Sequence, residues 1–143
     1  MKELRFAQIL RPKNKIQKAI VDIFGPFLSP NPVSLDTTEY VLNDLGVDGL
    51  GVGTGGQPFF SIGTQEFPFG QQAYAVGGNP HANLRAFGPA LARAEGLPEG
   101  SEAFQARTGY VDNALARALH GELTSDQYRP GGPIDAEYSA AGV

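Results

Sequence analysis

Residues 46–79 read GVDGLGVGTGGQPFFSIGTQEFPFGQQAYAVGGN and contain ten of the chain's 19 glycines. Glycine is costly to order, so such a segment folds only if its aromatic side chains bury enough apolar surface, roughly 150–250 Å² each, to offset that cost. The stretch therefore predicts short strands and turns held by whatever its aromatics pack against. We expect strands at 58–62 and 72–76.

The same stretch belongs to a longer region that lacks positive charge. No lysine or arginine occurs from Ala19 to Leu84, whereas six acidic residues do. A free domain ordinarily intersperses both signs of charge over its surface, whereas interface cores are poor in charge and rich in aromatics. The region therefore either faces another protein or is a long neutral loop folded on its own domain. On the first interpretation, the partner-binding residues are Phe59, Phe60, Phe67, Phe69 and Tyr74.

The chain begins with a basic segment, because six of its eleven lysines and arginines lie in the first eighteen residues. Residues 4–10 alternate in a way that predicts a short extended arm, which cannot be stable without a partner strand. Apolar residues then recur at helical spacing from Ile16 to Phe24, with Pro12 suited to the first helical position and Gly25 to the end. The cations suit salt-dependent contact with nucleic-acid phosphates, although a solvated basic helix face or a protein-facing arm is the favoured explanation. The candidates for that contact are Arg11, Lys13, Lys15 and Lys18.

Further helices are predicted on either side of the glycine-rich stretch. Prolines at 26, 30 and 32 predict a stiff connector. Asp36 and Glu39 form a capping-box pattern for a helix of about ten residues that Gly46 ends. Asn79-Pro80 begins a helical stretch with a break at Gly88-Pro89 and a stop at Gly96. Ser101 caps a longer, alanine-rich helix to His120-Gly121, with Gly109 as the expected point of any interruption.

These elements predict an α+β fold: a small, loop-rich domain with three to four short helices, a Gly/aromatic-rich region of short strands and extended terminal arms. Residues 1–33 would hold the basic arm, an amphipathic helix and the proline-rich connector. Residues 34–128 would form the body, with the Gly/aromatic segment at 46–79 and Ala-rich helices at 80–121. Residues 129–143 would form an extended tail.

Few residues carry recognisable chemistry. Gly51, Gly53 and Gly56 match G-x-G-x-x-G, but the following Gln57-Pro58 does not open a helix and no acid stands about twenty residues on, so a conformational loop is favoured over a nucleotide site. The two histidines, His81 and His120, lack metal-ligand spacing. The chain has no cysteine, which excludes disulfides, thiolate zinc and cysteine catalysis. We therefore expect no catalytic residue, cofactor or metal.

Neither a leader peptide nor an apolar run of membrane-spanning length is visible in the sequence. The pattern favours a non-enzymatic structural subunit of a large assembly, most concretely a small virion protein of the capsid cement, decoration or head-tail connector type. Its partners would be many copies of other protein subunits, with possible nucleic-acid contact through the N-terminus. It would assemble in the host cytoplasm, or otherwise be cytoplasmic. The alternatives are a small-ligand-binding or enzymatic domain using the 49–56 loop, and an accessory subunit of a cellular complex.

Overall fold

The computed structural model describes residues 11–25, 28, 33–70 and 80–121. This part of the chain contains the helices α2 (Lys15–Phe24), α3 (Val33–Asp44), α4 (Pro80–Ala94) and α5 (Glu102–Leu119), together with the strands β1 (Gly49–Val52), β2 (Pro58–Ile62) and β3 (Gln65–Pro68). The predicted α+β domain with four helices and a small sheet is therefore confirmed. The predicted arm at 4–10, the strand at 72–76 and the tail at 129–143 lie outside the described residues.

The three strands form one antiparallel sheet in the order β1-β2-β3. The strand predicted at 58–62 is confirmed, whereas β1 and β3 were not predicted. Register places Leu50 opposite Phe60 and Phe60 opposite Phe67, so these three side chains share one face. Phe60 is fully buried and Leu50 nearly so, which identifies this row as the inner face.

Five phenylalanines from the sheet and two helices make the centre of the core. The Phe60 ring centroid lies 5.3 Å from that of Phe87 on α4 and 5.4 Å from that of Phe67. Phe69 meets Phe87 edge-on at 5.2 Å and stacks near Phe24 of α2 at 6.3 Å. Offset and edge-to-face pairs of this kind add to the gain from burial alone. The glycine-rich stretch is thus held by the chain's own helices.

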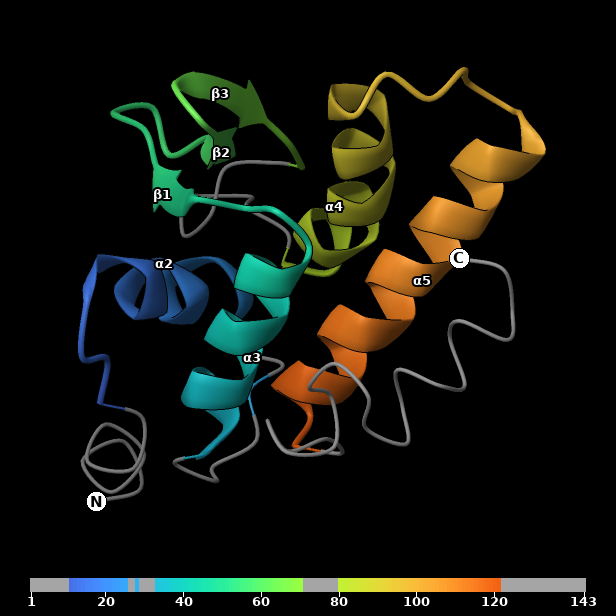
Figure 1. Ribbon diagram of the computed structural model, residues 1–143. Helices are drawn as coiled ribbons and strands as arrows, with labels where there is room; N and C mark the ends of the chain where they lie inside the picture. The colour runs from blue at the N-terminus through green and yellow to red at the C-terminus, as the bar shows by residue number, and fades with distance from the viewer. Residues whose placement is uncertain (1–10, 26–27, 29–32, 71–79, 122–143) are drawn as a thin grey trace.

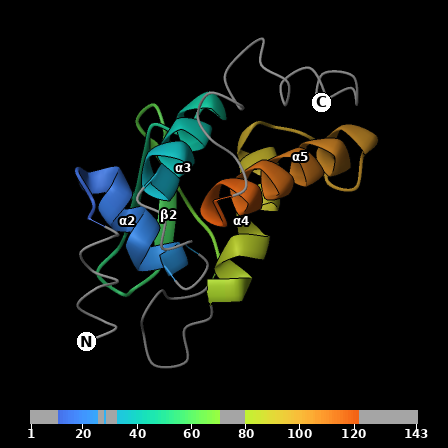
Figure 2. The ribbon, with the colours of Figure 1, turned by 90° about the horizontal axis from the view of Figure 1, so that it is seen from below.

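The helices form a layer against the inner face of the sheet, and α5 lies on the far side of α3 and α4 (Figure 1). Helix α2 packs against β1 and α3, while α5 packs against α3 and α4 (Figure 2). Gly46, Gly96 and Gly121 all have positive φ at the ends of α3, α4 and α5, so the helix stops predicted there are confirmed.

Two predicted helix starts differ from the structure. Helix α2 begins at Lys15 rather than Pro12, because the side chain of Asn14 accepts a hydrogen bond from the Gln17 amide and caps the helix. Helix α3 begins at Val33, which places Asp36 inside its first turn. The capping box is therefore wrong, and both of its acids instead accept hydrogen bonds from α2. Ser101 does cap α5, accepting from the Phe104 amide at 3.1 Å.

The predicted break at Gly88-Pro89 is also wrong, because α4 runs through Pro89 without interruption. A proline inside a helix costs about 3 kcal/mol, so packing must hold the two halves together. Phe87 and Leu91, on either side of Pro89, are both fully buried. Gly88 lets α5 approach closely, since a β-carbon there would lie 3.0 Å from the Thr108 carbonyl oxygen. Helix α5 likewise continues through Gly109.

Candidate functional site

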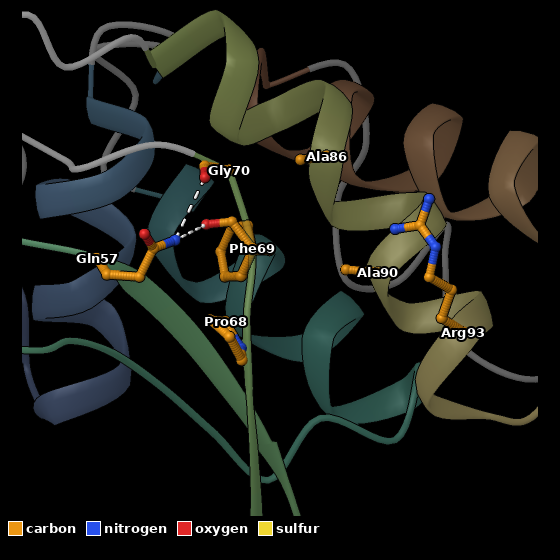
Figure 3. A pocket seen from close by; sticks show the side chains of 7 residues that line it. All are labelled: Gln57, Pro68, Phe69, Gly70, Ala86, Ala90 and Arg93. Carbon is orange, nitrogen blue, oxygen red and sulfur yellow. Dashed lines mark hydrogen bonds between the residues drawn. The ribbon is translucent and has the colours of Figure 1, made fainter.

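An open groove of about 530 Å³ lies between the end of the sheet and α4 (Figure 3). A second hollow of about 230 Å³ shares Pro68, Ala90 and Arg93 with it and extends the groove along the helix. The groove and its extension, called here the β3–α4 groove, are lined by Gln57, Phe67, Pro68, Phe69, Gly70, Ala86, Ala90, Arg93 and Ala94.

The sheet side of the groove is a backbone edge rather than one face of a strand. Four consecutive residues, 67–70, line it, and side chains of consecutive strand residues point to opposite faces. The Phe69 amide donates to the Pro58 carbonyl at 3.0 Å, which extends the β2–β3 pairing by one residue. The Gln57 side chain then donates to the carbonyls of Phe69 at 2.8 Å and Gly70 at 3.3 Å (Figure 3). These bonds fix the chain where it leaves the sheet.

Gly70 is required at this exit for steric reasons. It adopts a φ of 62°, and a β-carbon at this position would lie 2.7 Å from the Cα of Asn83 on α4. Both the left-handed backbone and the close approach favour glycine. The floor of the groove therefore depends on a direct contact between the strand exit and the helix.

The helical side of the groove is smooth and carries one charge. Ala86, Ala90 and Ala94 repeat at a spacing of four residues on one face of α4, so no long side chain fills the groove. Arg93 lies among them, and its Nε contacts the Glu99 carboxylate. The same guanidinium lies over the ring of Phe104, 5.7 Å from its centroid. The groove is thus lined by small and apolar residues together with polar groups, and the cation at its rim is already paired.

Among the described residues that line the groove, few carry reactive groups. Arg93 is the one titratable side chain among the lining residues, and none of them is a hydroxyl, thiol or imidazole that could act as nucleophile or base. Among the residues that the structure describes, no group of three histidine or acidic side chains could hold a metal ion. His120 lies at the C-cap of α5, where the helix was predicted to end.

The five aromatic residues predicted to bind a partner are divided by the structure. Phe60 is buried in the chain's own core, so a partner cannot reach it in this conformation, whereas Phe69 is largely buried in the core but also lines the β3–α4 groove. Phe67 is partly buried against that core and also borders the groove. Phe59 is half-buried on the outer face of the sheet. Tyr74 lies outside the described residues.

The outer face of the sheet explains two of its glycines. A β-carbon at Gly51 would lie 2.8 Å from the Cζ atom of Phe59, and one at Gly49 would lie 2.6 Å from the Ser61 Oγ. The side chains of β2 therefore fold over the outer face of β1, where Gly49 and Gly51 have no side chains. Residues 49–52 form β1 and pair with β2, and neither hollow of the β3–α4 groove includes a residue of 49–56. The arrangement lacks the strand-to-helix turn that a dinucleotide site requires.

The four basic candidates lie around the start of α2, where two of them are paired. Lys13 donates to both carboxylate oxygens of Asp36, at 3.0 and 3.1 Å. This hydrogen-bonded ion pair, together with a hydrogen bond from Gln17, keeps the pKa of Asp36 below its ordinary value despite opposing desolvation. Lys18 pairs with Asp22 at 2.8 Å. Arg11 and Lys15 are exposed.

The buried side chain of Gln17 joins α2 to α3. Its Nε2 donates to Asp36 at 2.9 Å and to Glu39 at 2.7 Å, and its Oε1 accepts from the Lys13 amide at 3.0 Å. Asn14 also donates to Glu39 at 3.2 Å. Three acids, Asp22, Asp36 and Glu39, thus contact the basic segment, so its local charge is nearly balanced rather than strongly positive.

A half-buried carboxylate that the sequence did not single out, that of Asp112, lies between α4 and α5. Burial raises the pKa of Asp112 to about 6, against the opposing effect of a backbone hydrogen bond from Gly88. Its Oδ1 and the Thr108 hydroxyl are buried without a hydrogen-bond partner. The residues that line the groove were not predicted either, although the repeated small residues at 86, 90 and 94 were a visible signal.

Comparisons with protein-family models, with curated proteins and with solved structures find no match to this chain. Within the described part of the chain, no helix combines the length and apolar character needed to cross a bilayer.

Proposed function

We propose that the protein is a non-enzymatic structural subunit of a larger assembly and that it acts by burying surface against neighbouring subunits. The observation that carries the proposal is the open β3–α4 groove, lined largely by alanine, proline and phenylalanine residues, beside a sheet region without a single cation. Pro68 belongs to both surfaces, since it is exposed in β3 and lines both hollows of the groove. A contact surface depleted in charge and containing apolar groups is typical of subunit interfaces.

The distribution of charge over the described residues supports this proposal. The exposed residues of 33–70 include Asp44, Asp48 and Glu66 but no lysine or arginine, whereas Arg85, Arg93, Arg107 and Arg117 all lie on α4 and α5. The described residues of 33–70 are therefore neutral to acidic, whereas α4 and α5 carry four arginines. A subunit whose charge is distributed unevenly can bring an acidic surface of one copy into contact with a basic surface of its neighbour.

The most concrete setting for such a subunit is a virion, as a capsid cement, decoration or head-tail connector protein. A cellular multi-subunit complex would use the same physical features. The small-ligand or enzymatic alternative has less support, because 49–56 form a strand and a turn rather than a phosphate-binding loop, and because the groove lacks catalytic groups.

The proposal is tested by the size of the protein in the cells or particles that produce it. Extracts are separated under native conditions by gel filtration or gradient sedimentation, and the chain is located in the fractions with an antibody. We expect it at a mass far above its 15.2 kDa. Recovery of all the protein at the monomer mass, at its natural concentration, would refute an assembly role.

A further inference from the structure

The two sides of the β3–α4 groove carry opposite charges. Arg93, the one charged side chain among the described lining residues, lies on the helical side, across from Pro68 (Figure 3). Glu66 lines neither hollow, but it is exposed in β3 two residues before Pro68. Residues two apart in a strand point to the same face, so Glu66 shares the face of Pro68, which is exposed and lines both hollows. The strand side of the groove therefore presents an acid and the helical side a cation.

These two charges are not paired with each other. Glu66 has no ion pair with another residue of the described part of the chain, whereas the Arg93 Nε contacts the Glu99 carboxylate. A guanidinium has further N–H donors on its terminal nitrogens, so Arg93 can bind a second carboxylate while it keeps the contact with Glu99. The stacking of this guanidinium over the Phe104 ring also restricts its position. Arg93 thus suits an acid that comes from outside its own chain.

The helical side of the groove can receive a strand because its side chains are short. Ala90 and Ala94 line the second hollow together with Phe67 and Pro68, which places this part of β3 level with the last turn of α4. Pro68 has no N–H and cannot donate to a backbone ladder, so a strand of this kind makes contact through side chains. The exposed Pro68 ring is a suitable group to pack on the alanines of α4.

The pattern is self-complementary. A two-fold axis along the groove exchanges its strand side with its helical side, so the β3 of each copy lies on the α4 of the other. Glu66 of one copy then meets Arg93 of its partner, and the same pair forms a second time. The apolar contact between Pro68 and the alanines provides affinity, while the two charge pairs determine the orientation.

We infer that the β3–α4 groove is the contact between two copies of this chain, in which Glu66 of each copy pairs with Arg93 of the other. This inference rests on the proposed assembly role and names one of its contacts. Because both copies use the same surface, the contact gives a closed dimer, and a larger assembly needs a second surface as well.

Charge reversal in the full-length chain tests this contact. Glu66→Arg and Arg93→Glu each place like charges at both pairs of the homodimer, so the dimer dissociation constant of either variant should rise about tenfold or more. In an equimolar mixture the new arginine of one variant faces the new glutamate of the other, and the native Glu66 faces the native Arg93. The mixture should therefore form a heterodimer with an affinity close to that of the wild type.

Sedimentation velocity measures the affinities, and native mass spectrometry distinguishes the heterodimer from the two homodimers by mass. Asp44→Arg and Arg11→Glu are the matched controls, because they make the same charge changes at exposed residues that do not line the groove; both should dimerise as the wild type does. Circular dichroism establishes that each variant is folded. If a reversal does not fold, Glu66→Gln and Arg93→Gln replace the two variants, and their mixture should regain one of the two pairs.

Three results would each overturn the inference: a wild type that stays monomeric up to millimolar concentration, a charge-reversal variant that dimerises as the wild type does, or a mixture without a heterodimer. The size of the native protein in extracts is measured separately. A native mass far above that of the monomer, combined with any of these results, would leave the assembly role intact and remove only this contact.

Discussion

Replacing Asp112 by asparagine should stabilise the protein at neutral pH and have little effect in acid. The carboxyl group lies between α4 and α5, and burial raises its pKa from an ordinary 3.8 to about 6. Asparagine keeps the shape of the side chain but never carries a charge. The substitution therefore removes only the cost of holding a carboxylate in this position.

The size of the effect follows from the change in pKa. Each pKa unit corresponds to about 1.4 kcal/mol, so a change from 3.8 to about 6 sets an upper limit of about 3 kcal/mol. Because the carboxyl is only half-buried, solvent screening reduces this to about 1 to 1.5 kcal/mol. That is a large fraction of the margin by which an ordinary domain is stable.

The raised pKa of Asp112 also determines the sign of the stability change and the pH range over which it develops. Between pH 3.8 and about 6 the folded protein holds a proton on Asp112 that the unfolded chain has released. The unfolded state therefore binds fewer protons, and the stability of the wild type falls as the pH rises through this window. The stability difference between Asp112→Asn and wild type should be close to zero near pH 4, rise between pH 4 and 6, and remain constant above pH 7.

Urea unfolding followed by far-ultraviolet circular dichroism measures this difference at each pH, since the chain has no tryptophan. Glu66→Gln makes the same chemical change at an exposed residue of β3 and should give a much smaller difference at every pH. An Asp112→Asn protein that is equally stable relative to wild type at pH 4 and 7 would refute the reasoning. So would one that is less stable at pH 7, because the carboxylate would then be favoured by a contact that outweighs its burial.

Three other predictions test contacts elsewhere in the domain. Gly88→Ala should lower the melting temperature, because the added β-carbon would lie 3.0 Å from the Asp112 Cγ. This clash should outweigh the gain of about 1 kcal/mol that alanine has over glycine inside a helix. A raised melting temperature would contradict the close packing of α4 on α5. Gln17→Leu should cost about 1–3 kcal/mol in urea unfolding, since it removes the buried amide that joins α2 to α3; an unchanged midpoint would show that this link contributes nothing. Lys15→Ala should reduce retention on heparin at low salt more than Lys18→Ala, because only the second ammonium is paired with a carboxylate; equal losses, or none, would argue against phosphate contact through the exposed cations.

Signals that depend on neighbouring residues in the chain were sufficient for much of the fold. The strand at 58–62, the Ser101 cap and the helix ends at Gly46, Gly96 and Gly121 were all predictable from the sequence. Each depends on a local requirement: a β-favouring aromatic run, a hydroxyl that accepts an amide hydrogen, or a positive φ. The apolar face of α2 was equally visible, and Ile20, Ile23 and Phe24 are all fully buried.

Features that depend on distant residues were not predictable. Gly49 and Gly51 were interpreted as loop glycines, yet they form β1 because β2 lies beside them and covers them with Ser61 and Phe59. Pro89 was interpreted as a break, yet packing on α5 keeps α4 continuous. Asp36 and Glu39 do not form a capping box; instead, both accept hydrogen bonds from the Gln17 side chain of α2. In each case a tertiary contact outweighs the local preference.

The candidate site lay beyond sequence reasoning for a related reason. Phe59 and Phe60 are adjacent and chemically identical, but one faces outward and the other lies in the core, and only the strand register distinguishes them. The prediction that all five aromatic residues bind a partner therefore combined core residues with surface residues. Phe60 and Phe69 are buried by the chain's own core, so the domain does not need a partner to cover these two rings. Their presence in the sequence is therefore no argument for a partner. The assembly proposal rests instead on the surface that remains exposed: the open β3–α4 groove and a sheet region without cations.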